Sequence, residues 1–182
     1  KPYLNCDKLE ELKKPYFADK KSDVNWLKST VKLLARGGCE SKAFYLECSE
    51  ALFALEPSSD AALGLAKGFG KQGDNDKAIS YYTKAADLAP NDDAKYDIWI
   101  KLAKTAKNSK QYSAVRDYAR KAIAINPNSG EAYILIGDAY AASAGSCGSG
   151  ELGRGGVYLV AVDKYARAKS IDPSVAEAAQ AK

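Results

Sequence analysis

The sequence of 182 residues contains no histidine, and this absence limits what the protein can do. Histidine is the commonest general base and the commonest metal ligand, so catalysis here would depend on carboxylates, lysine, tyrosine or cysteine. No apolar run approaches 18 residues, which argues against a membrane-spanning helix. We therefore predict that the protein is not an enzyme and holds no cofactor and no metal ion.

The sequence also lacks a strong charge of either sign. The 27 basic and 23 acidic residues give a net charge of +4, and no basic stripe alternates with stacking aromatics. A nucleic-acid-binding surface is therefore not indicated, and an ordinary solvated surface accounts for the charges. Charged residues make up 27% and apolar residues 46%, a composition that favours a folded chain over a disordered one.

What the chain does have is a repeated helix ending. At four places a proline follows an apolar helical pattern, with a large apolar residue two positions before it. A signature that recurs in this way predicts a repeat architecture, because each repeat is one supersecondary unit. The four segments are Leu55-Glu56-Pro57, Leu88-Ala89-Pro90, Ile125-Asn126-Pro127 and Ile171-Asp172-Pro173.

Each repeat is predicted to be a pair of helices. Apolar residues at i, i+3, i+4 and i+7 mark one face of the first helix, and a second apolar face follows before the proline. Between them, Gly73-Asp74 fits a turn in which glycine takes the left-handed conformation and aspartate caps the next helix. The first helices carry Ala62, Leu65, Ala66 and Phe69; Trp99, Leu102, Ala103 and Ala106; and Tyr133, Ile136, Gly137 and Tyr140. The second helices carry Ala78, Ile79, Tyr82, Ala85 and Leu88; Val115, Ala119, Ala122 and Ile125; and Ala161, Tyr165, Ala168 and Ile171.

The ends of the array and one insertion depart from this regularity. An N-terminal capping segment is predicted over 1–21, with a short helix that ends at Pro15. The repeats follow as a degenerate unit over 22–58 that Asp23 caps, then 59–92, 93–129, 130–173 and the start of a C-terminal helix over 174–182. The third full repeat contains an insertion at 143–156, and its glycine-dense part over 145–156 is predicted to be a mobile loop. Because the chain stops inside an apparent helix, we expect more protein to follow.

These residues resemble the tetratricopeptide repeat. The motif Tyr133-x-x-Ile136-Gly137-x-x-Tyr140 fits the first half of that family's 34-residue unit, and Ala161, Tyr165, Ala168 and Pro173 fit the second half. The resemblance covers about residues 22–182. It implies an all-α right-handed superhelix of stacked antiparallel helix pairs, with a concave groove that binds a protein or peptide.

Position by position, the resemblance assigns groove-facing residues to the first helix of each pair. They combine a row of Leu63, Ile100 and Ile134 with several lysines, so the sequence suggests a ligand that has an apolar strip and some acidic groups. The assigned residues are Asp60, Leu63, Lys67, Lys71, Asp97, Ile100, Lys101, Lys104, Asn108, Glu131, Ile134 and Asp138. Some family members clamp a C-terminal carboxylate with a lysine–asparagine set, but Leu63, Lys67, Lys101, Glu131 and Leu135 stand at those positions. Binding of a chaperone tail is therefore not predicted.

The cysteines allow several pairings. No Cys-x-x-Cys pair is present, so zinc is not indicated, and three complete pairings remain possible. Cys39 and Cys147 are separated by two repeats and should lie too far apart, and Cys48 fits a buried position within a helix. A bridge between Cys6 and Cys39 is plausible if the protein is exported to an oxidising compartment.

Two other motifs that could indicate catalysis are explained better without it. Gly148-x-Gly150-x-x-Gly153 fits a dinucleotide fingerprint in spacing, but it follows a predicted helix where that motif needs a strand. Cys147 as a nucleophile would have no histidine base.

The general style of three segments also resembles exported repeat proteins of Bacteroidetes bacteria. These segments are Asn5–Leu9, Gly38-Cys39 and Ala161–Tyr165. The sequence thus predicts a non-catalytic scaffold in a bacterial envelope complex, located in the periplasm or cell envelope, with the cytoplasm as the alternative. A glycan-binding accessory of nutrient uptake, for which the 12 tyrosines and two tryptophans could supply stacking faces, is the second hypothesis. A helper domain of a longer enzyme is the third, and the oligomeric state is open.

Overall fold

The computed structural model describes residues 5–146 and 151–181, with the side chains of 151–153 left aside. The described residues are helical or irregular and contain no β-strand, as expected for an all-α protein. They form two compact units, unit 1 up to Pro90 and unit 2 from Asn91 onward. The predictions that concern Cys147 and residues 147–150 lie outside the described part of the chain.

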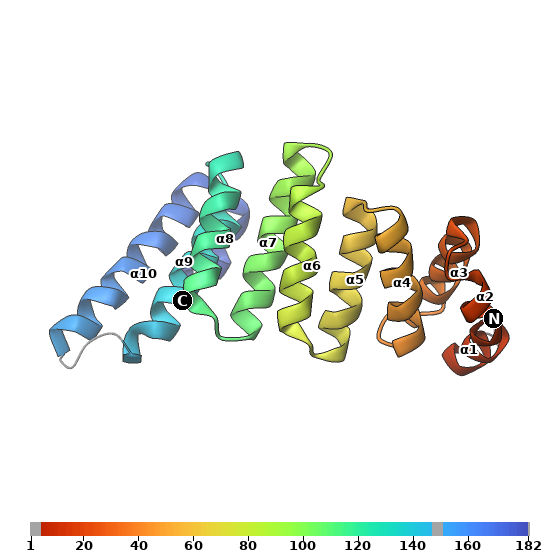
Figure 1. Ribbon diagram of the computed structural model, residues 1–182. Helices are drawn as coiled ribbons and strands as arrows, with labels where there is room; N and C mark the ends of the chain where they lie inside the picture. Colours follow the sequence, from red (N-terminus) through yellow and green to blue (C-terminus); the bar gives the residue numbers. More distant parts are fainter. Residues whose placement is uncertain (1–4, 147–150, 182) are drawn as a thin grey trace. The chain divides into compact units, whose positions relative to one another are not determined.

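Unit 1 is a row of antiparallel helices that begins with a small cap. The cap consists of α1 (Cys6–Lys13), a 3₁₀ turn (Lys14–Tyr16) and α2 (Phe17–Lys20). The helices α3 (Val24–Arg36), α4 (Ala43–Leu55), α5 (Ser59–Gln72) and α6 (Asn75–Asp87) then follow, each packed against the next (Figure 1).

The cap is held to unit 1 by both apolar and covalent contacts. Leu9 of α1 is buried, and its side chain lies over Gly37, where an added Cβ would come within 2.9 Å of it. The ring of Phe17 meets Phe44 edge to face at 5.8 Å. A disulfide joins Cys6 to Cys39, with 5.5 Å between their α-carbons. Cys48 is a free thiol and fully buried in α4, where burial raises its pKa to about 12.

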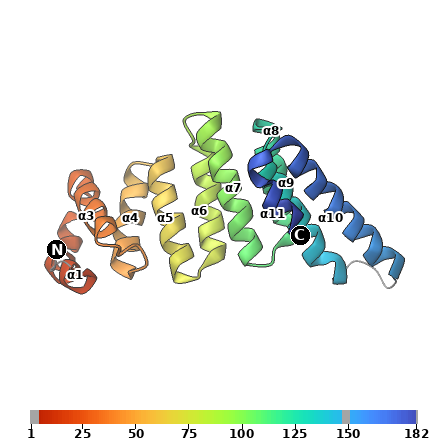
Figure 2. The same ribbon diagram turned by 180° about the vertical axis from the view of Figure 1, so that it is seen from behind.

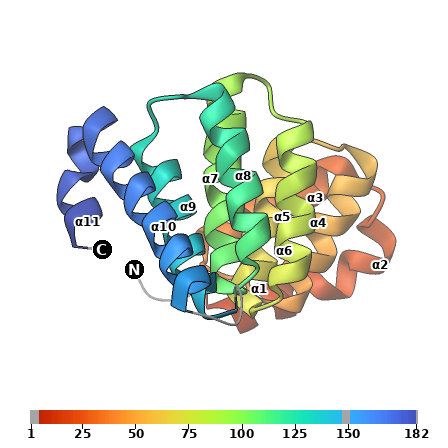
Figure 3. The same cartoon turned by 90° about the vertical axis from the view of Figure 1, so that its left-hand side faces the viewer.

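Unit 2 repeats the paired arrangement with longer helices. It contains α7 (Asp92–Asn108), α8 (Tyr112–Ile125), α9 (Gly130–Ser143), α10 (Glu151–Ile171) and α11 (Ala176–Gln180), with 3₁₀ turns at Ala144–Ser146 and Pro173–Val175. Each of these α-helices packs against the next, and α7 also contacts α9 (Figure 2). After α10 the chain turns back into α11 (Figure 3).

The helix ends follow the local signals in the sequence. Asp23 caps α3 by accepting a hydrogen bond from the Trp26 N–H, and Asp74 caps α6 in the same way with Lys77. Gly73 takes φ = +84°, the left-handed conformation predicted for it. Helices α4, α6, α8 and α10 all end within three residues before a proline, as the repeated signature predicts.

The prediction of a mobile loop over 145–156 is wrong for residues 151–156. Helix α10 begins at Glu151, and Gly155 and Gly156 lie within it. Glycine costs a helix only about 1 kcal/mol relative to alanine, whereas adding a residue to an existing helix gains a backbone hydrogen bond. The well-packed part of α10, which includes Ala161 and Tyr165, therefore continues toward its N-terminus through the glycines.

The core consists of the residues that face between the helices of each unit. The small positions of the repeat, Ala66, Ala103 and Gly137, are buried, and the large residues Trp99 and Tyr165 are buried beside them. The leucines two positions before Pro57 and Pro90 are not buried in this way, because one lies in the last turn of a helix and the other directly follows a helix. Leu55 is 47% exposed and Leu88 is 42% exposed, so neither belongs to the core.

Candidate functional site

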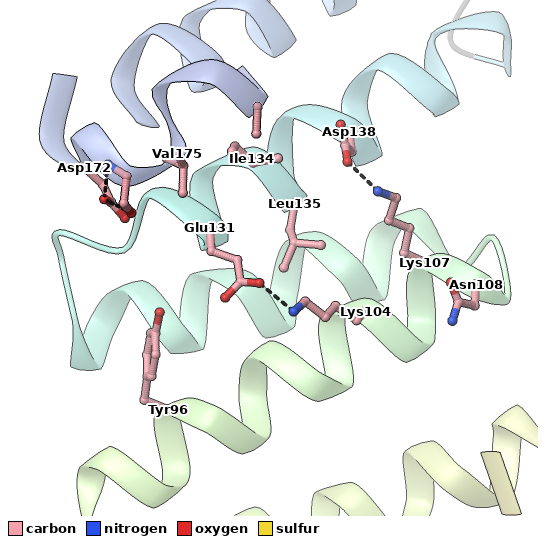
Figure 4. A pocket seen from close by; sticks show the side chains of 12 residues that line it. Tyr96, Lys104, Lys107, Asn108, Glu131, Ile134, Leu135, Asp138, Asp172 and Val175 are labelled. Carbon is pink, nitrogen blue, oxygen red and sulfur yellow. Dashed lines mark hydrogen bonds and ion pairs between the residues drawn. The ribbon is translucent and has the colours of Figure 1, made fainter. Parts of the chain in front are cut away.

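A concavity that a ligand could enter lies in unit 2 and has a volume of about 660 Å³ (Figure 4). A volume of this size is within the range of ligand pockets in proteins, about 300–1,000 Å³. Helices α7 and α9 form two of its walls, and the segment from Asp172 to Ala178 forms the third. The lining residues are Tyr96, Lys104, Lys107, Asn108, Glu131, Ile134, Leu135, Asp138, Asp172, Ser174, Val175 and Ala178.

Gly130 allows the third wall to lie close to α9. A Cβ built on this buried glycine would come within 2.5 Å of Val175 Cγ2 and 2.6 Å of Asp172 Cβ. The preceding residue, Ser129, caps α9 by accepting a hydrogen bond from the Ala132 N–H, and its hydroxyl is 2.7 Å from the hydroxyl of Tyr96. The N-terminus of α9 is thus fixed against both α7 and the segment after Pro173.

The floor of the pocket is aliphatic. Ile134, Val175 and Ala178 are half-buried or exposed, and Figure 4 shows the side chains of Ile134 and Val175 near one another. Leu135 is almost fully buried beneath them. An apolar group of a ligand could therefore lose its hydration here against aliphatic side chains.

The pocket's lysines are paired with carboxylates on the opposite wall. Lys104 Nζ lies 2.6 Å from Glu131 Oε1, and Lys107 bonds to Asp138 Oδ2. The carboxylate of Asp138 is only 9% exposed, and its other oxygen accepts a hydrogen bond of 2.9 Å from the Tyr165 hydroxyl. Asp138 therefore connects α7, α9 and α10. Burial, followed by the hydrogen bond to this carboxylate, raises the pKa of Tyr165 far above its usual value.

Replacing Tyr165 with phenylalanine should lower the free energy of unfolding by about 1.5–3 kcal/mol, since one hydrogen bond to a nearly buried carboxylate is lost. Chemical denaturation followed by circular dichroism measures this change. Tyr140→Phe is the matched control, because the Tyr140 hydroxyl has only an exposed 3.4 Å contact with Arg120. Equal effects of the two substitutions would contradict a stabilising role for the Tyr165 hydroxyl.

Five of the residues that the resemblance assigned to the groove line this pocket. They are Lys104, Asn108, Glu131, Ile134 and Asp138. Ile100 is 5% exposed and does not line it, so it cannot offer the apolar surface expected of it. Asp97 is exposed on α7 and Lys101 is half-buried there, and neither lines the pocket. Asp60, Leu63, Lys67 and Lys71 lie on α5 in unit 1, where Lys71 pairs with Glu40 at 3.0 Å.

The lining residues that the resemblance did not assign to the groove are Tyr96, Lys107, Leu135 and the wall from Asp172 to Ala178. Lys107 follows Lys104 by three residues on the same helix, a spacing that places both on one face. The wall after Pro173 had a weaker signal, namely a glycine directly after the α9 cap. Glycine at that place permits the close approach of another segment.

Several aromatic rings outside the pocket are engaged with one another and with cations. Trp99 stacks on Tyr118 at 5.9 Å, and Lys121 Nζ lies 4.3 Å from the centre of the Trp99 ring. In unit 1, Phe69 stacks on Tyr81 at 5.5 Å. These ring faces are used within the protein, so they do not favour the hypothesis of a sugar-stacking surface.

Among residues 5–146 and 151–181, no group of three or more cysteine, aspartate or glutamate side chains is arranged to hold a metal ion. No helix in those ranges has both the length and the apolar character required to cross a bilayer.

Comparison with protein families identifies the repeat. Residues 61–92 and 96–129 both match the family model described as tetratricopeptide repeat. The chain contains tetratricopeptide repeats. The first match covers most of α5 and all of α6, and the second covers most of α7 and all of α8. No curated protein sequence matches the chain.

Several solved structures share this fold. A crystal structure of MamA superposes with a TM-score of 0.67 at 21% identity, covering 94% of this chain and 85% of that one. MamA from Desulfovibrio magneticus RS-1 gives 0.61 at 17% identity, covering 82% and 76%. YrrB, described as a TPR protein with an unusual peptide-binding site, gives 0.59 at 17% identity, covering 91% and 77%. At these identities the likeness establishes the fold.

Proposed function

We propose that this tetratricopeptide repeat protein is a non-catalytic scaffold that binds a peptide segment of a partner protein in the pocket of unit 2. The observation that carries the proposal is an aliphatic floor, formed by Ile134, Val175 and Ala178, between rims of charged side chains. Ligand pockets in proteins combine a mostly apolar lining with a few fixed polar groups in this way. The peptide-binding site named for YrrB supports the same use of the fold.

The pocket is suited to binding because its walls are held in place without a ligand. Asp138 is bonded from α7 and α10, and Ser129 and Gly130 fix the start of α9. A partner that binds here does not have to order these helices, so less of its interaction energy is lost to conformational entropy. This rigidity fits a scaffold that holds a segment through contact alone.

The location proposed for this scaffold is the periplasm or cell envelope of a bacterium, within an envelope complex. The disulfide between Cys6 and Cys39 supports this location, because structural disulfides persist in oxidising compartments and are rare in the cytosol.

The substitution Ile134→Glu should reduce binding of the partner at least about tenfold, since it places a charge on the apolar floor. The partner is first captured with the full chain from the envelope fraction of the source cells and identified by mass spectrometry. Its affinity is then measured by titration calorimetry with the wild-type chain and the variant.

Val162→Glu is the matched control for this experiment. Val162 is an aliphatic residue of unit 2 that is 60% exposed on α10, away from the pocket lining. The control should bind the partner as the wild-type chain does. Binding that survives Ile134→Glu, or that fails equally in both variants, would place the interaction outside the pocket and contradict the proposal.

A further inference from the structure

The pocket of unit 2 carries a net negative charge, although its lysines alone would suggest a positive one. Lys104 and Lys107 contribute two positive charges, whereas Glu131, Asp138 and Asp172 contribute three negative ones. The sum of +2 and −3 leaves a formal charge of −1. Both ammonium groups are already engaged by carboxylates of α9.

An acidic ligand would have to break these pairs to reach the lysines. Lys107 is bonded to the carboxylate of Asp138, which is only 9% exposed and also accepts a hydrogen bond from the Tyr165 hydroxyl. Separating Lys107 from Asp138 would leave this nearly buried negative charge without its cation. Lys104 and Glu131 are more exposed, so their ion pair is weaker and easier to break. Even there, an acidic group would lie beside Glu131 and be repelled by it.

Asp172 differs from the other two carboxylates of the pocket, which are both paired with lysines. One of its oxygens accepts hydrogen bonds from the backbone N–H and the hydroxyl of Ser174. Within the described ranges, no lysine or arginine forms an ion pair with it. Its second oxygen lies over Gly130, at the edge of the pocket. Figure 4 shows Asp172 beside Val175, so its carboxylate lies next to the aliphatic floor.

We infer that the segment held in this pocket carries a lysine or arginine next to an aliphatic side chain. The aliphatic group contacts Ile134 and Val175, and the cation binds Asp172, where a charge-assisted hydrogen bond can form. This inference rests on the proposed function and specifies its ligand. It also reverses the acidic preference that the groove lysines suggest from the sequence.

The test uses three pools of fluorescent, end-blocked hexapeptides that share a central leucine or isoleucine. The flanking positions are lysine and arginine in the first pool, aspartate and glutamate in the second, and glutamine in the third. Binding to the full chain is measured by fluorescence anisotropy. The basic pool should bind about tenfold more tightly than the acidic pool, with the neutral pool between them, and the difference should shrink at high salt.

Two variants locate the preference in the pocket. Asp172→Asn keeps an oxygen that can accept the Ser174 hydrogen bonds but removes the charge, and it should weaken binding of the basic pool about fivefold. Glu131→Gln removes a carboxylate and leaves Lys104 without its partner. It should therefore also reduce the preference, measured as the affinity for the basic pool divided by the affinity for the acidic pool. Asp87→Asn, an exposed carboxylate on α6, changes the net charge equally and should leave binding unchanged. Thermal unfolding verifies that each variant is folded.

Each result separates the inference from the proposed function. If acidic peptides bind as tightly as basic ones and Ile134→Glu abolishes both, the pocket binds peptides but the preference for a cation is wrong. If no pool loses affinity on Ile134→Glu, the pocket is not the peptide site and the proposed function fails with the inference. If Asp87→Asn weakens binding of the basic pool as much as Asp172→Asn does, the preference reflects the net charge of the protein and not the pocket. That result would overturn the inference.

Discussion

Replacing Cys6 with serine is expected to lower the free energy of unfolding of unit 1 by about 3–4 kcal/mol. The disulfide to Cys39 closes a loop with a sequence separation of 33 residues, and the loss of chain entropy in the unfolded state scales with the logarithm of that length. Urea denaturation of the oxidised wild-type chain and the variant measures the difference. Leu9 stays in contact with Gly37 in the variant, so we expect the cap to loosen while the remaining helices stay folded.

The double variant Cys6→Ser, Cys39→Ser is the control for this prediction, and its stability should be close to that of the single variant. Thiols are counted in denaturant, because the buried Cys48 thiol, with its pKa raised to about 12, reacts slowly in the native protein. Reduction should increase the count by two. An unchanged count with four thiols already free would show that the bridge does not form, and it would remove the main support for an oxidising compartment.

Replacing Gly137 with alanine should destabilise unit 2 by about 1–3 kcal/mol, although alanine is the better helix former by about 1 kcal/mol. The new Cβ would lie 2.5–2.9 Å from ring atoms of Tyr165. That ring is buried and its hydroxyl is bonded to Asp138, so it cannot withdraw without breaking the hydrogen bond. Guanidinium denaturation followed by circular dichroism measures the loss.

Gly70→Ala provides the matched comparison, because it makes the same change at an exposed position of α5. The nearest contact for its Cβ would be Ala78 Cβ at 3.8 Å, an ordinary van der Waals distance. This variant should therefore be as stable as the wild-type chain or more stable by up to about 1 kcal/mol. If Gly137→Ala also proved neutral or stabilising, the close approach of α10 to α9 would be wrong.

Most of the helices could be predicted because their signals are local. A proline that ends a helix, a left-handed glycine at position 73 and the aspartate caps at 23 and 74 act within a few residues of where they stand. The small residues of the repeat, such as Gly137, were also identifiable, since their fixed spacing reflects close packing of paired helices.

The candidate site could be predicted only in part, because its properties depend on pairs of distant residues. Lys107 and Asp138 are 31 positions apart, and Tyr165 is 27 positions from Asp138. A lysine on a predicted groove face gives no sign of whether a carboxylate neutralises it, and this is why the sequence favoured an acidic ligand. The wall at Asp172 depends on the chain turning back over Gly130, and a single glycine after a helix cap does not say which segment approaches it.

The glycines at the start of α10 are helical for a reason that lies outside their own stretch of sequence. Propensity summed over 145–156 favours a loop, but a helix also extends from a stable neighbouring segment. The packed residues Ala161, Tyr165 and Ala168 supply that stability from outside the window.

The most direct test of peptide binding in unit 2 is nuclear magnetic resonance mapping on the full isotope-labelled chain. The peptide is one hexapeptide of the basic pool, with a central leucine flanked by lysine and arginine. Titration should perturb amides near Lys104 on α7, near Ile134 on α9 and from Asp172 to Ala178, and Asp172→Asn should reduce these changes. Perturbations confined to unit 1 or to the outer face of α10, or none at saturating peptide, would contradict a binding pocket in unit 2.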